Sequence, residues 1–170
     1  MRTRAGYITV ISAYAPTLLA SDDDKDEFYQ QLTNLISSIP AGHDMTLLGD
    51  FNARICADAD SWTSIIGRFG VDKINENGQR LLELCSLFNI SVASSIFKGS
   101  LRSKVTWMQP RSRRWIQLDH VIIRRRQLRG LKQCSSMHSA DCGTDHALVR
   151  CKLQITPKKF YQTRPKPLPL

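Results

Sequence analysis

The sequence has 170 residues, with 24 Lys and Arg against 15 Asp and Glu, and its formal net charge is +9. A chain of this length suits one domain, which can bury about 70% of its unfolded surface. No stretch approaches the roughly 18 apolar residues that a membrane-spanning helix needs, which excludes a membrane-spanning protein. The positive charge favours a polyanionic partner.

The five cysteines include no closely spaced pair. A secreted disulfide framework is therefore not expected, and a nuclear or cytoplasmic location fits better than secretion. Residues 1–4 and the apolar stretch behind them faintly resemble a signal peptide. Polar residues interrupt that stretch, so a strand is the better interpretation.

The first half of the chain alternates strand and helix patterns. Residues 7–14 alternate and are rich in β-branched and aromatic residues, which predicts a strand. Ser21 is a predicted helix cap, and the acidic first turn behind it complements the helix dipole. Pro40 ends this helix. Its inner face is predicted to carry Phe28, Leu32, Leu35, Ile36 and Ile39.

The middle of the chain contains a buried strand, a long loop and a second helix. Residues 45–49 form a short apolar run, 53–76 a long loop, 77–88 a helix and 90–93 a short strand. Long loops inside compact domains are often functional. The inner face of the second helix is predicted to carry Leu81, Leu84, Cys85 and Phe88.

The last third is predicted to be mostly β-structure. Residues 105–108 and 117–123 are predicted to form a hairpin around 110–113, and 147–155 to form a last strand. From residue 156 the chain is basic and rich in proline, which is typical of an extended tail.

Polar residues with chemical potential follow the predicted strands. Asp50 and Asn52 lie two apart after a buried strand, so both can face the same way, although Gly-Asp-Phe-Asn also suits a plain turn. Asp119, Asp145 and His146 also lie at strand ends or loop starts. Carboxylates suit Mg²⁺, a carboxylate orients an imidazole, and another positions a water. Together these groups meet the needs of metal-assisted phosphoester hydrolysis.

Four motifs occur in an order that resembles the endonuclease/exonuclease/phosphatase superfamily, which includes pancreatic deoxyribonuclease and the apurinic/apyrimidinic endonucleases. They are residues 47–52, 105–107, 117–120 and 144–146. The helix at 77–85 is most similar to the endonuclease domain of LINE-type retrotransposons and to craniofacial development protein 2-like proteins. The resemblance covers roughly residues 5–155. It implies an α+β fold, a two-layer β-sandwich flanked by helices.

The resemblance also implies roles for the polar residues. Asp50 would position the attacking water, and Asn52 would hydrogen-bond the scissile phosphate. His146 would stabilise charge on the phosphate, with Asp119 orienting it. Asp145 would bind Mg²⁺ or Mn²⁺.

One part of the family pattern is absent. Tyr14 matches the family's tyrosine that contacts the phosphate, and in the family a metal-binding glutamate comes before that strand. Here no acidic residue precedes Tyr14, and the first glutamate is Glu27. We therefore expect the chain to correspond to the C-terminal two-thirds of such a domain. We expect Mg²⁺ to be weakly held or lost, and activity to be weak or absent.

DNA is the expected partner. Arg111, Arg113, Arg114 and Trp115 are predicted at a hairpin tip, where they would follow a phosphate backbone and stack on a base, unless the hairpin is a plain exposed turn. A reverse transcriptase module would accompany the domain in a full-length relative. Residues 124–126 form a basic patch of the kind found in nuclear localisation signals.

Three alternatives to an active endonuclease remain open. The first is a catalytically inactive nucleic-acid-binding remnant of a retrotransposon endonuclease. The second is a phosphatase of small molecules or lipid head groups. The third is a zinc site, for which buried free thiols are the simpler interpretation. Its ligands would be Cys134, His138, Cys142 and His146, with Cys151 nearby.

Overall fold

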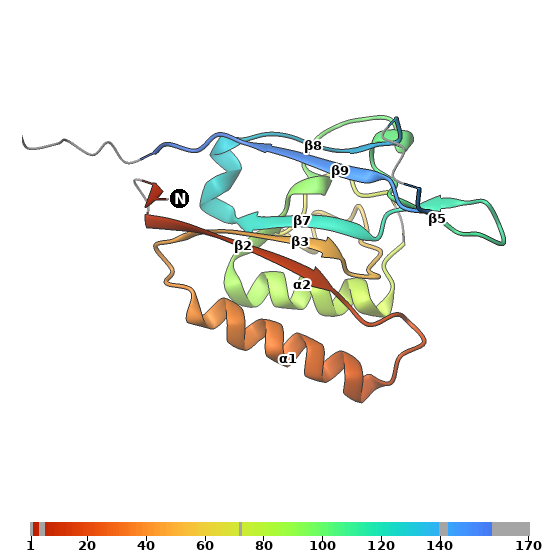
Figure 1. Ribbon diagram of the computed structural model, residues 1–170, viewed down its shortest axis with the longest axis horizontal. Coiled ribbons are helices and arrows are strands. Elements are labelled where there is room, and N and C mark those ends of the chain that lie inside the picture. Colours follow the sequence, from red (N-terminus) through yellow and green to blue (C-terminus); the bar gives the residue numbers. More distant parts are fainter. Residues whose placement is uncertain (1, 4–5, 72, 140–142, 158–170) are drawn as a thin grey trace, which may run out of the picture.

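A five-stranded sheet forms the centre of the molecule in the computed structural model, which describes residues 2–3, 6–71, 73–139 and 143–157. The strand order is β1-β2-β3-β7-β4. Two helices cover one face of this sheet, and a smaller sheet of β8 and β9 lies over part of the other face (Figure 1). The two sheets form a β-sandwich flanked by helices, which confirms the predicted α+β class.

The first half of the chain forms a parallel crossover. Strand β2 (Gly6–Tyr14) pairs in parallel with β3 (Asp44–Asp50), and α1 (Asp22–Ser38) connects them. Ser21 caps α1, as predicted, because its Oγ accepts a hydrogen bond from the Asp24 N–H at 3.1 Å. Strand β1 (Arg2–Thr3) pairs antiparallel with the first two residues of β2, and Thr3 also forms an isolated bridge with Pro157.

The second helix leads into the other half of the central sheet. Helix α2 (Glu76–Phe88) is capped by Asn75 and ends at Asn89, which adopts the left-handed conformation with φ 51°. It continues into β4 (Ile90–Val92), which pairs antiparallel with β7 (Asp119–Arg124). Strand β7 also pairs antiparallel with β3 and so lies inside the sheet.

The remaining elements are short or lie outside the central sheet. They are β5 (Trp107–Met108), β6 (Trp115–Ile116), β8 (Leu131–Met137) and β9 (Leu148–Leu153), with 3₁₀ turns at Ala93–Ser95, Leu101–Ser103 and Arg125–Gly130.

The hairpin predicted from residues 105–108 and 117–123 was wrong, because its two segments have other partners. Residues 105–108 do not pair with 117–123; instead β5 pairs with β6 around the tip, and β7 joins the central sheet. The apolar run from Val121 to Ile123 is buried, which suits a central strand covered on both faces.

The main core lies between the central sheet and the two helices. Met45 and Leu47 of β3 pack with Leu81, Leu82 and Ile122, and all five side chains are fully buried. Leu35, predicted on the inner face of α1, is instead 45% exposed. A smaller apolar cluster joins β7 to the β8–β9 sheet. The helix face of the sheet is thus the better covered one.

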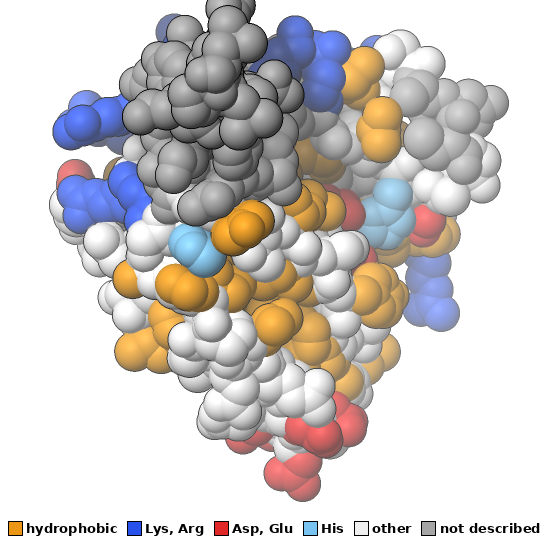
Figure 2. All heavy atoms as spheres, turned by 60° about the vertical axis from the view of Figure 1, so that its left-hand side comes forward, with side chains coloured by type: hydrophobic (Ala, Val, Ile, Leu, Met, Phe, Trp, Pro, Cys, Tyr) orange, Lys and Arg blue, Asp and Glu red, His pale blue; other side chains and the backbone are white. Residues whose placement is uncertain are grey.

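The opposite face of β2 is much less covered. Val10 is 64% exposed and Tyr14 is 73% exposed. Residues 8–14 of β2 pair with β3 on one side, and no strand among the described residues pairs with them on the other. Figure 2 shows hydrophobic side chains gathered across the middle of this side of the molecule. We call this surface the open face.

Two other sequence predictions concern basic segments, residues 124–126 and the tail from residue 156. The basic patch at 124–126 is partly used in packing, since Arg124 donates to the carbonyls of Ile39 and His43 and Arg126 pairs with Asp44. The tail predicted from residue 156 lies mostly outside the described residues. None of the described helices is long and apolar enough to span a membrane.

Candidate active site

Three of the predicted site residues meet at one end of the central sheet. The strand registers pair Tyr14 of β2 with Asp50 of β3, and Asp50 with Asp119 of β7. Paired residues of neighbouring strands project from the same face of a sheet. Val10 and Tyr14 share one face of β2 because they are an even number of positions apart, so all three site side chains project from the open face.

His146 completes this group from a different part of the chain. Its Nδ1 lies 3.0 Å from Asp119 Oδ2, and its Nε2 lies 3.9 Å from Asp50 Oδ2. The segment before β9 is held against β5, where Ala147 N–H donates to the Thr106 carbonyl and Met108 N–H to the Asp145 carbonyl. The imidazole therefore lies between two carboxylates from adjacent strands.

A buried threonine fixes Asp119. Thr106 Oγ1 accepts hydrogen bonds from the N–H groups of Leu118 (3.0 Å) and Asp119 (3.1 Å). Thr106 is 1% exposed. The sequence motif at 105–107 includes Thr106, but nothing in the pattern indicates that its hydroxyl would bind the main chain before Asp119.

The neighbours of Asp50 disfavour its ionised form on balance. Burial raises the pKa of the Asp50 carboxyl, and the charges of Asp119 and Asp145 raise it further. The Asn52 N–H, which donates to Asp50 Oδ1 at 2.8 Å, and His146 lower it. The net result is a raised pKa, as expected of a partly buried carboxyl beside other carboxylates.

Asn52 lies in the sharp turn after β3. It has φ 48°, a left-handed conformation that asparagine adopts more readily than most residues. Its side-chain amide donates to the Ala15 carbonyl at 2.9 Å, which links the ends of β2 and β3. Gly49, just before the turn, has φ 145°, and a Cβ there would lie 1.8 Å from the Ala13 carbonyl oxygen. Only glycine fits so close to β2.

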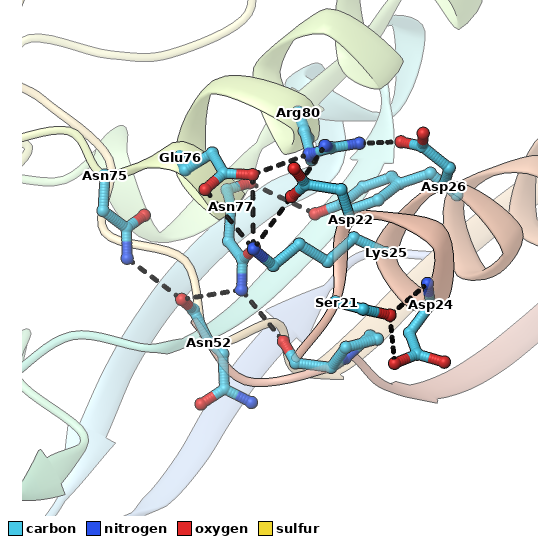
Figure 3. A network of polar contacts seen from close by, with 12 residues as sticks. Ser21, Asp22, Asp24, Lys25, Asp26, Asn52, Asn75, Glu76, Asn77 and Arg80 are labelled. Carbon is cyan, nitrogen blue, oxygen red and sulfur yellow. Dashed lines mark hydrogen bonds and ion pairs between the residues drawn. The ribbon is translucent and has the colours of Figure 1, made fainter. Parts of the chain in front are cut away.

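Two further asparagines hold this turn from the start of α2 (Figure 3). Asn75 donates to the Asn52 carbonyl at 3.1 Å, and Asn77 donates to the same carbonyl at 3.3 Å and to the Pro16 carbonyl at 2.9 Å. Asn77 is 1% exposed. No sequence pattern indicates these contacts beyond the position of both residues at a helix start.

The start of α2 is also tied to α1 by charge. The ammonium group of Lys25, buried in the structure, contacts Asp22 at 3.4 Å and Glu76 at 3.3 Å, and Arg80 pairs with Asp26 and Glu76 (Figure 3). These pairs give Asp22 and Asp26 of the acidic run a structural role. The prediction that this run has a structural origin therefore agrees with the contacts.

Asp145, the predicted metal ligand, is exposed beside the group. Its Oδ2 accepts a hydrogen bond from Trp107 Nε1 at 2.6 Å. Among the described residues, no three His, Cys, Asp or Glu side chains are arranged to hold a metal ion. Mg²⁺ usually keeps several waters and takes one or two carboxylates plus substrate phosphates. A single exposed carboxylate fits an open, weak Mg²⁺ site and does not fit a preformed cage.

The predicted zinc ligands are divided between different surroundings. His146 is bonded to Asp119, and the His138 ring lies edge-on against Trp115 with centroids 4.5 Å apart. Cys134 is a free buried thiol. Cys142 lies outside the described residues.

His120 follows Asp119 but points to the other side of β7. Its Nε2 lies 2.8 Å from the Ala53 carbonyl and its Nδ1 3.2 Å from Ser94 Oγ. It is 1% exposed. Its contacts are those of a core residue.

The predicted DNA-binding residues lie on the β5–β6 hairpin next to the site. Arg111, Arg113 and Arg114 are exposed at its tip, and none forms an ion pair with a residue that the structure describes. Trp115 is not at the tip as predicted; it belongs to β6 and is partly buried. The hairpin is attached to the site through Trp107, whose ring lies 6.3 Å from that of His146.

A groove of about 640 Å³ runs along the open face up to the site. It is lined by residues of β2, β3, β7 and β9 and of the segment before β9. Its lining is mainly apolar, with Asp119 and His146 at one end, and includes Ile8, Val10, Leu48, Val149, Cys151 and Leu153.

The fold and the site agree with comparisons to known proteins. Over 162 residues, 93% of this chain, the sequence is 35% identical to craniofacial development protein 2 from Bos taurus and 34% identical to that from Tragulus javanicus. The chain is similar in sequence to these proteins and spans about a quarter of their length (26% and 27%). No family model matches the sequence.

Solved structures give the fold. The 3′-5′ exonuclease NExo from Neisseria meningitidis superposes with a TM-score of 0.61 at 20% identity, covering 85% of this chain and 60% of that one. The catalytic domain of APE2 from Xenopus laevis gives a TM-score of 0.57 at 16% identity, covering 90% and 52%. The chain has the endonuclease/exonuclease/phosphatase fold.

The same fold occurs in a mobile-element protein. The endonuclease domain of TRAS1, a telomere-specific non-LTR retrotransposon, superposes on 76% of this chain with a TM-score of 0.54 at 12% identity, and 51% of that domain is covered. The solved structures therefore confirm the predicted fold, and the sequence has the predicted similarity to craniofacial development protein 2. In each of these comparisons the superposed region is a larger share of this chain than of the solved structure.

Proposed function

We propose that this domain is a phosphodiester hydrolase of DNA-endonuclease type. The single observation that carries the proposal is the position of His146 between Asp119 and Asp50, at 3.0 Å and 3.9 Å. An imidazole bonded to one carboxylate and beside another can stabilise developing charge while the second carboxylate handles the proton of a water. The group opens onto solvent at the end of the groove, where a phosphate can approach.

Each side chain has a distinct part in the proposed reaction. The Asp119 carboxylate accepts from His146 Nδ1, which directs Nε2 toward Asp50 and the space in front of it. Asp50 takes the proton of the attacking water, and its raised pKa makes it a better proton acceptor than an ordinary aspartate. His146 faces the phosphate oxygens. Asn52 and Tyr14 border the same end of the sheet and are proposed to contact the phosphate.

Asp145 is the proposed ligand of a divalent ion, Mg²⁺ or Mn²⁺. A bound ion would neutralise charge on the phosphate. Because Asp145 is one exposed carboxylate, the ion should be weakly held and should bind better when substrate phosphate is present.

DNA is the proposed substrate because the basic hairpin lies beside the site. Arg111, Arg113 and Arg114 are free of ion pairs with described residues and can bind backbone phosphates. The same observation favours a second candidate, a DNA-binding domain without catalysis. One protein of similar fold, the 3′ phosphatase NExo from Neisseria, has been solved bound to a product DNA hairpin.

Nicking of supercoiled plasmid with Mg²⁺ or Mn²⁺, and with EDTA as a blank, tests the proposal. Asp50→Asn and His146→Ala should each lower the nicking rate by about 100-fold or more, the usual size of a lost acid–base group. Two matched controls should leave the rate unchanged: Asp23→Asn on the exposed start of α1, and His43→Ala, whose ring contacts Tyr7 at the start of β2.

The possible outcomes separate the two candidates. Nicking that depends on Asp50 and His146 supports the hydrolase. Salt-sensitive DNA binding that weakens in Arg111→Ala and Arg113→Ala, without nicking, supports the binding domain. Nicking that survives both site substitutions would show a contaminating nuclease and overturn the proposal.

A further inference from the structure

Two cysteines face each other across the β8–β9 sheet. The strand register pairs Cys134 of β8 directly with Cys151 of β9. Directly paired residues of antiparallel strands have Cα atoms about 4.5 or 5.5 Å apart, and disulfides need about 4.4–6.8 Å. Both thiols are free in the structure. The strand register therefore places the two cysteines opposite each other, in the arrangement that a cross-strand disulfide needs.

The two thiols affect each other's ionisation. The interaction with the Cys134 thiol is the main reason why the pKa of Cys151 is lowered. The same interaction, together with burial, raises the pKa of Cys134. The sulfur that ionises more readily is thus Cys151.

The two thiols also differ in access. Cys134 is 6% exposed and packs in the cluster between β7 and the outer sheet. Cys151 is partly exposed and lines the groove of the open face. A small oxidant that enters the groove meets Cys151 first.

A buried cation lies near the pair. Lys104 interacts electrostatically with Cys134, and its ammonium group donates to the carbonyls of Phe69 (2.7 Å) and Phe97 (2.8 Å). A fixed positive charge favours a thiolate over a thiol. This cation supports ionisation of the pair at the stage when Cys134 must react.

We propose that Cys134 and Cys151 form a reversible thiol–disulfide pair, in which Cys151 is attacked first and Cys134 resolves. With glutathione disulfide as oxidant, the Cys151 thiolate attacks one glutathione sulfur, forms a mixed disulfide and releases one glutathione thiolate. Cys134 then loses its proton and attacks Cys151 Sγ, which releases the second thiolate. Two protein thiols are oxidised, one small disulfide is reduced, and the two protons pass to the released glutathiones.

The proposed disulfide would link residues on either side of a segment of the candidate site. The loop that it would close runs from 134 to 151 and contains Asp145 and His146. A crosslink that closes this loop reduces the conformations of the unfolded chain. Oxidation would therefore stabilise the pairing of β8 with β9, the strand that follows the segment carrying His146, whether or not the proposed hydrolysis takes place.

The test uses the whole chain in glutathione redox buffers, followed by alkylation and peptide mapping by mass spectrometry. Trypsin cuts after Lys132, Arg150 and Lys152, so Cys134 and Cys142 stay on one peptide while Cys151 is on another. A Cys142→Ser background therefore assigns the crosslink. We expect one disulfide, between the peptides of Cys134 and Cys151, that forms as well in Cys142→Ser and Cys56→Ser as in the parent.

The order of attack is tested with single variants. Cys134→Ser should accumulate a glutathione adduct on Cys151, because the resolving thiol is gone. Cys151→Ser should accumulate several-fold less adduct on Cys134. Cys134→Ala serves as a second variant if serine disturbs the buried site, and circular dichroism checks that each variant is folded.

Several results would overturn the inference. A disulfide from Cys151 to Cys142, or loss of the crosslink in Cys142→Ser, would show that the strand register does not decide the pairing. Equal adducts in the two single variants would overturn the order of attack. Thiols that stay reduced in fully oxidising glutathione buffer would overturn the pair itself. None of these readouts depends on nicking activity.

Discussion

The two faces of the central sheet are built from the same strands but have different roles. On the helix face, Met45 and Leu47 are fully buried under α1 and α2. On the open face, Val10 and Tyr14 of β2 remain more than half exposed, and the β8–β9 sheet covers mainly the β7 side. The helix face carries most of the buried core residues, and the open face carries the candidate site.

This division follows from the alternation of side chains along each strand. Ile11 and Ala13 of β2 pack toward the helices, whereas Val10 and Tyr14 point to the groove side. The polar end of β3 needs contact with water and substrate, so a lightly covered face suits it. Stability should therefore be most sensitive on the helix face and function on the open face.

The largest effect is expected from the helix face. Leu81→Ala removes a fully buried side chain from the main core. It should lower the free energy of unfolding by about 2–5 kcal/mol. Urea denaturation followed by circular dichroism measures it. A loss below about 1 kcal/mol would mean that the core can collapse around the gap and that the two faces differ less than their burial indicates.

The next effect concerns the link between α2 and the site. Asn77→Ala removes the donor to the carbonyls of Pro16 and Asn52 and should cost about 1–3 kcal/mol, the penalty of leaving buried groups unpaired. It should also lower the proposed nicking activity. Asn34→Ala, where the side chain makes only an exposed contact with Gln30, is the matched control and should change neither.

At the site, Asp50→Asn is expected to raise the stability of the protein, by less than the two substitutions above lower it. Because the folded protein raises the pKa of Asp50 above its unfolded value, ionised Asp50 destabilises the fold. That cost is absent below the unfolded pKa and develops as the pH rises through the folded one. Asp50→Asn should therefore be more stable than the parent at neutral pH and similar to it in acid. Denaturation at several pH values measures this difference.

The control for Asp50→Asn is Asp23→Asn on the exposed start of α1. A gain in stability that is the same at all pH values, or that Asp23→Asn reproduces, would mean that general charge and not the site is responsible.

The smallest effect is expected on the open face. Val10→Ala changes a side chain that is 64% exposed and should alter stability by no more than about 0.5 kcal/mol. Its unfolding curve should overlay that of the parent. A loss approaching that of Leu81→Ala would show that the open face is covered in solution and would erase the contrast between the two faces.

The central features of the site could be predicted from the sequence. Asp50, Asp119 and His146 are recognisable from their motifs, and the structure brings them within 4 Å of one another in the pairs His146–Asp119 and His146–Asp50. The helix caps and strands β2 and β3 follow from local patterns. These elements depend mainly on their own residues, so sequence reasoning is sufficient for them.

Other features depend on partners distant in the chain. Strand β8 is not evident in the sequence because Gln133, Ser135 and Ser136 interrupt any apolar alternation, and pairing with β9 makes it a strand. The roles of Thr106 and Asn77 depend on which carbonyls and N–H groups the fold brings near them. The sequence could not show which strand pairs with β7. The apolar run from Val121 to Ile123 suits a local hairpin as well as a long-range pairing with β3.

The outer side of β2, with which no described strand pairs along residues 8–14, has a consequence for the behaviour of the protein in concentrated solution. Within the part of the chain that the structure describes, these residues offer main-chain N–H and C=O groups to an approaching strand, and the segment contains no Lys, Glu or Pro. Natural proteins usually protect such edges with charged side chains, proline or a covering segment. Its high β-propensity makes it a template for self-assembly. Concentration-dependent aggregation should therefore start at β2, and the single substitution Val10→Lys should suppress it.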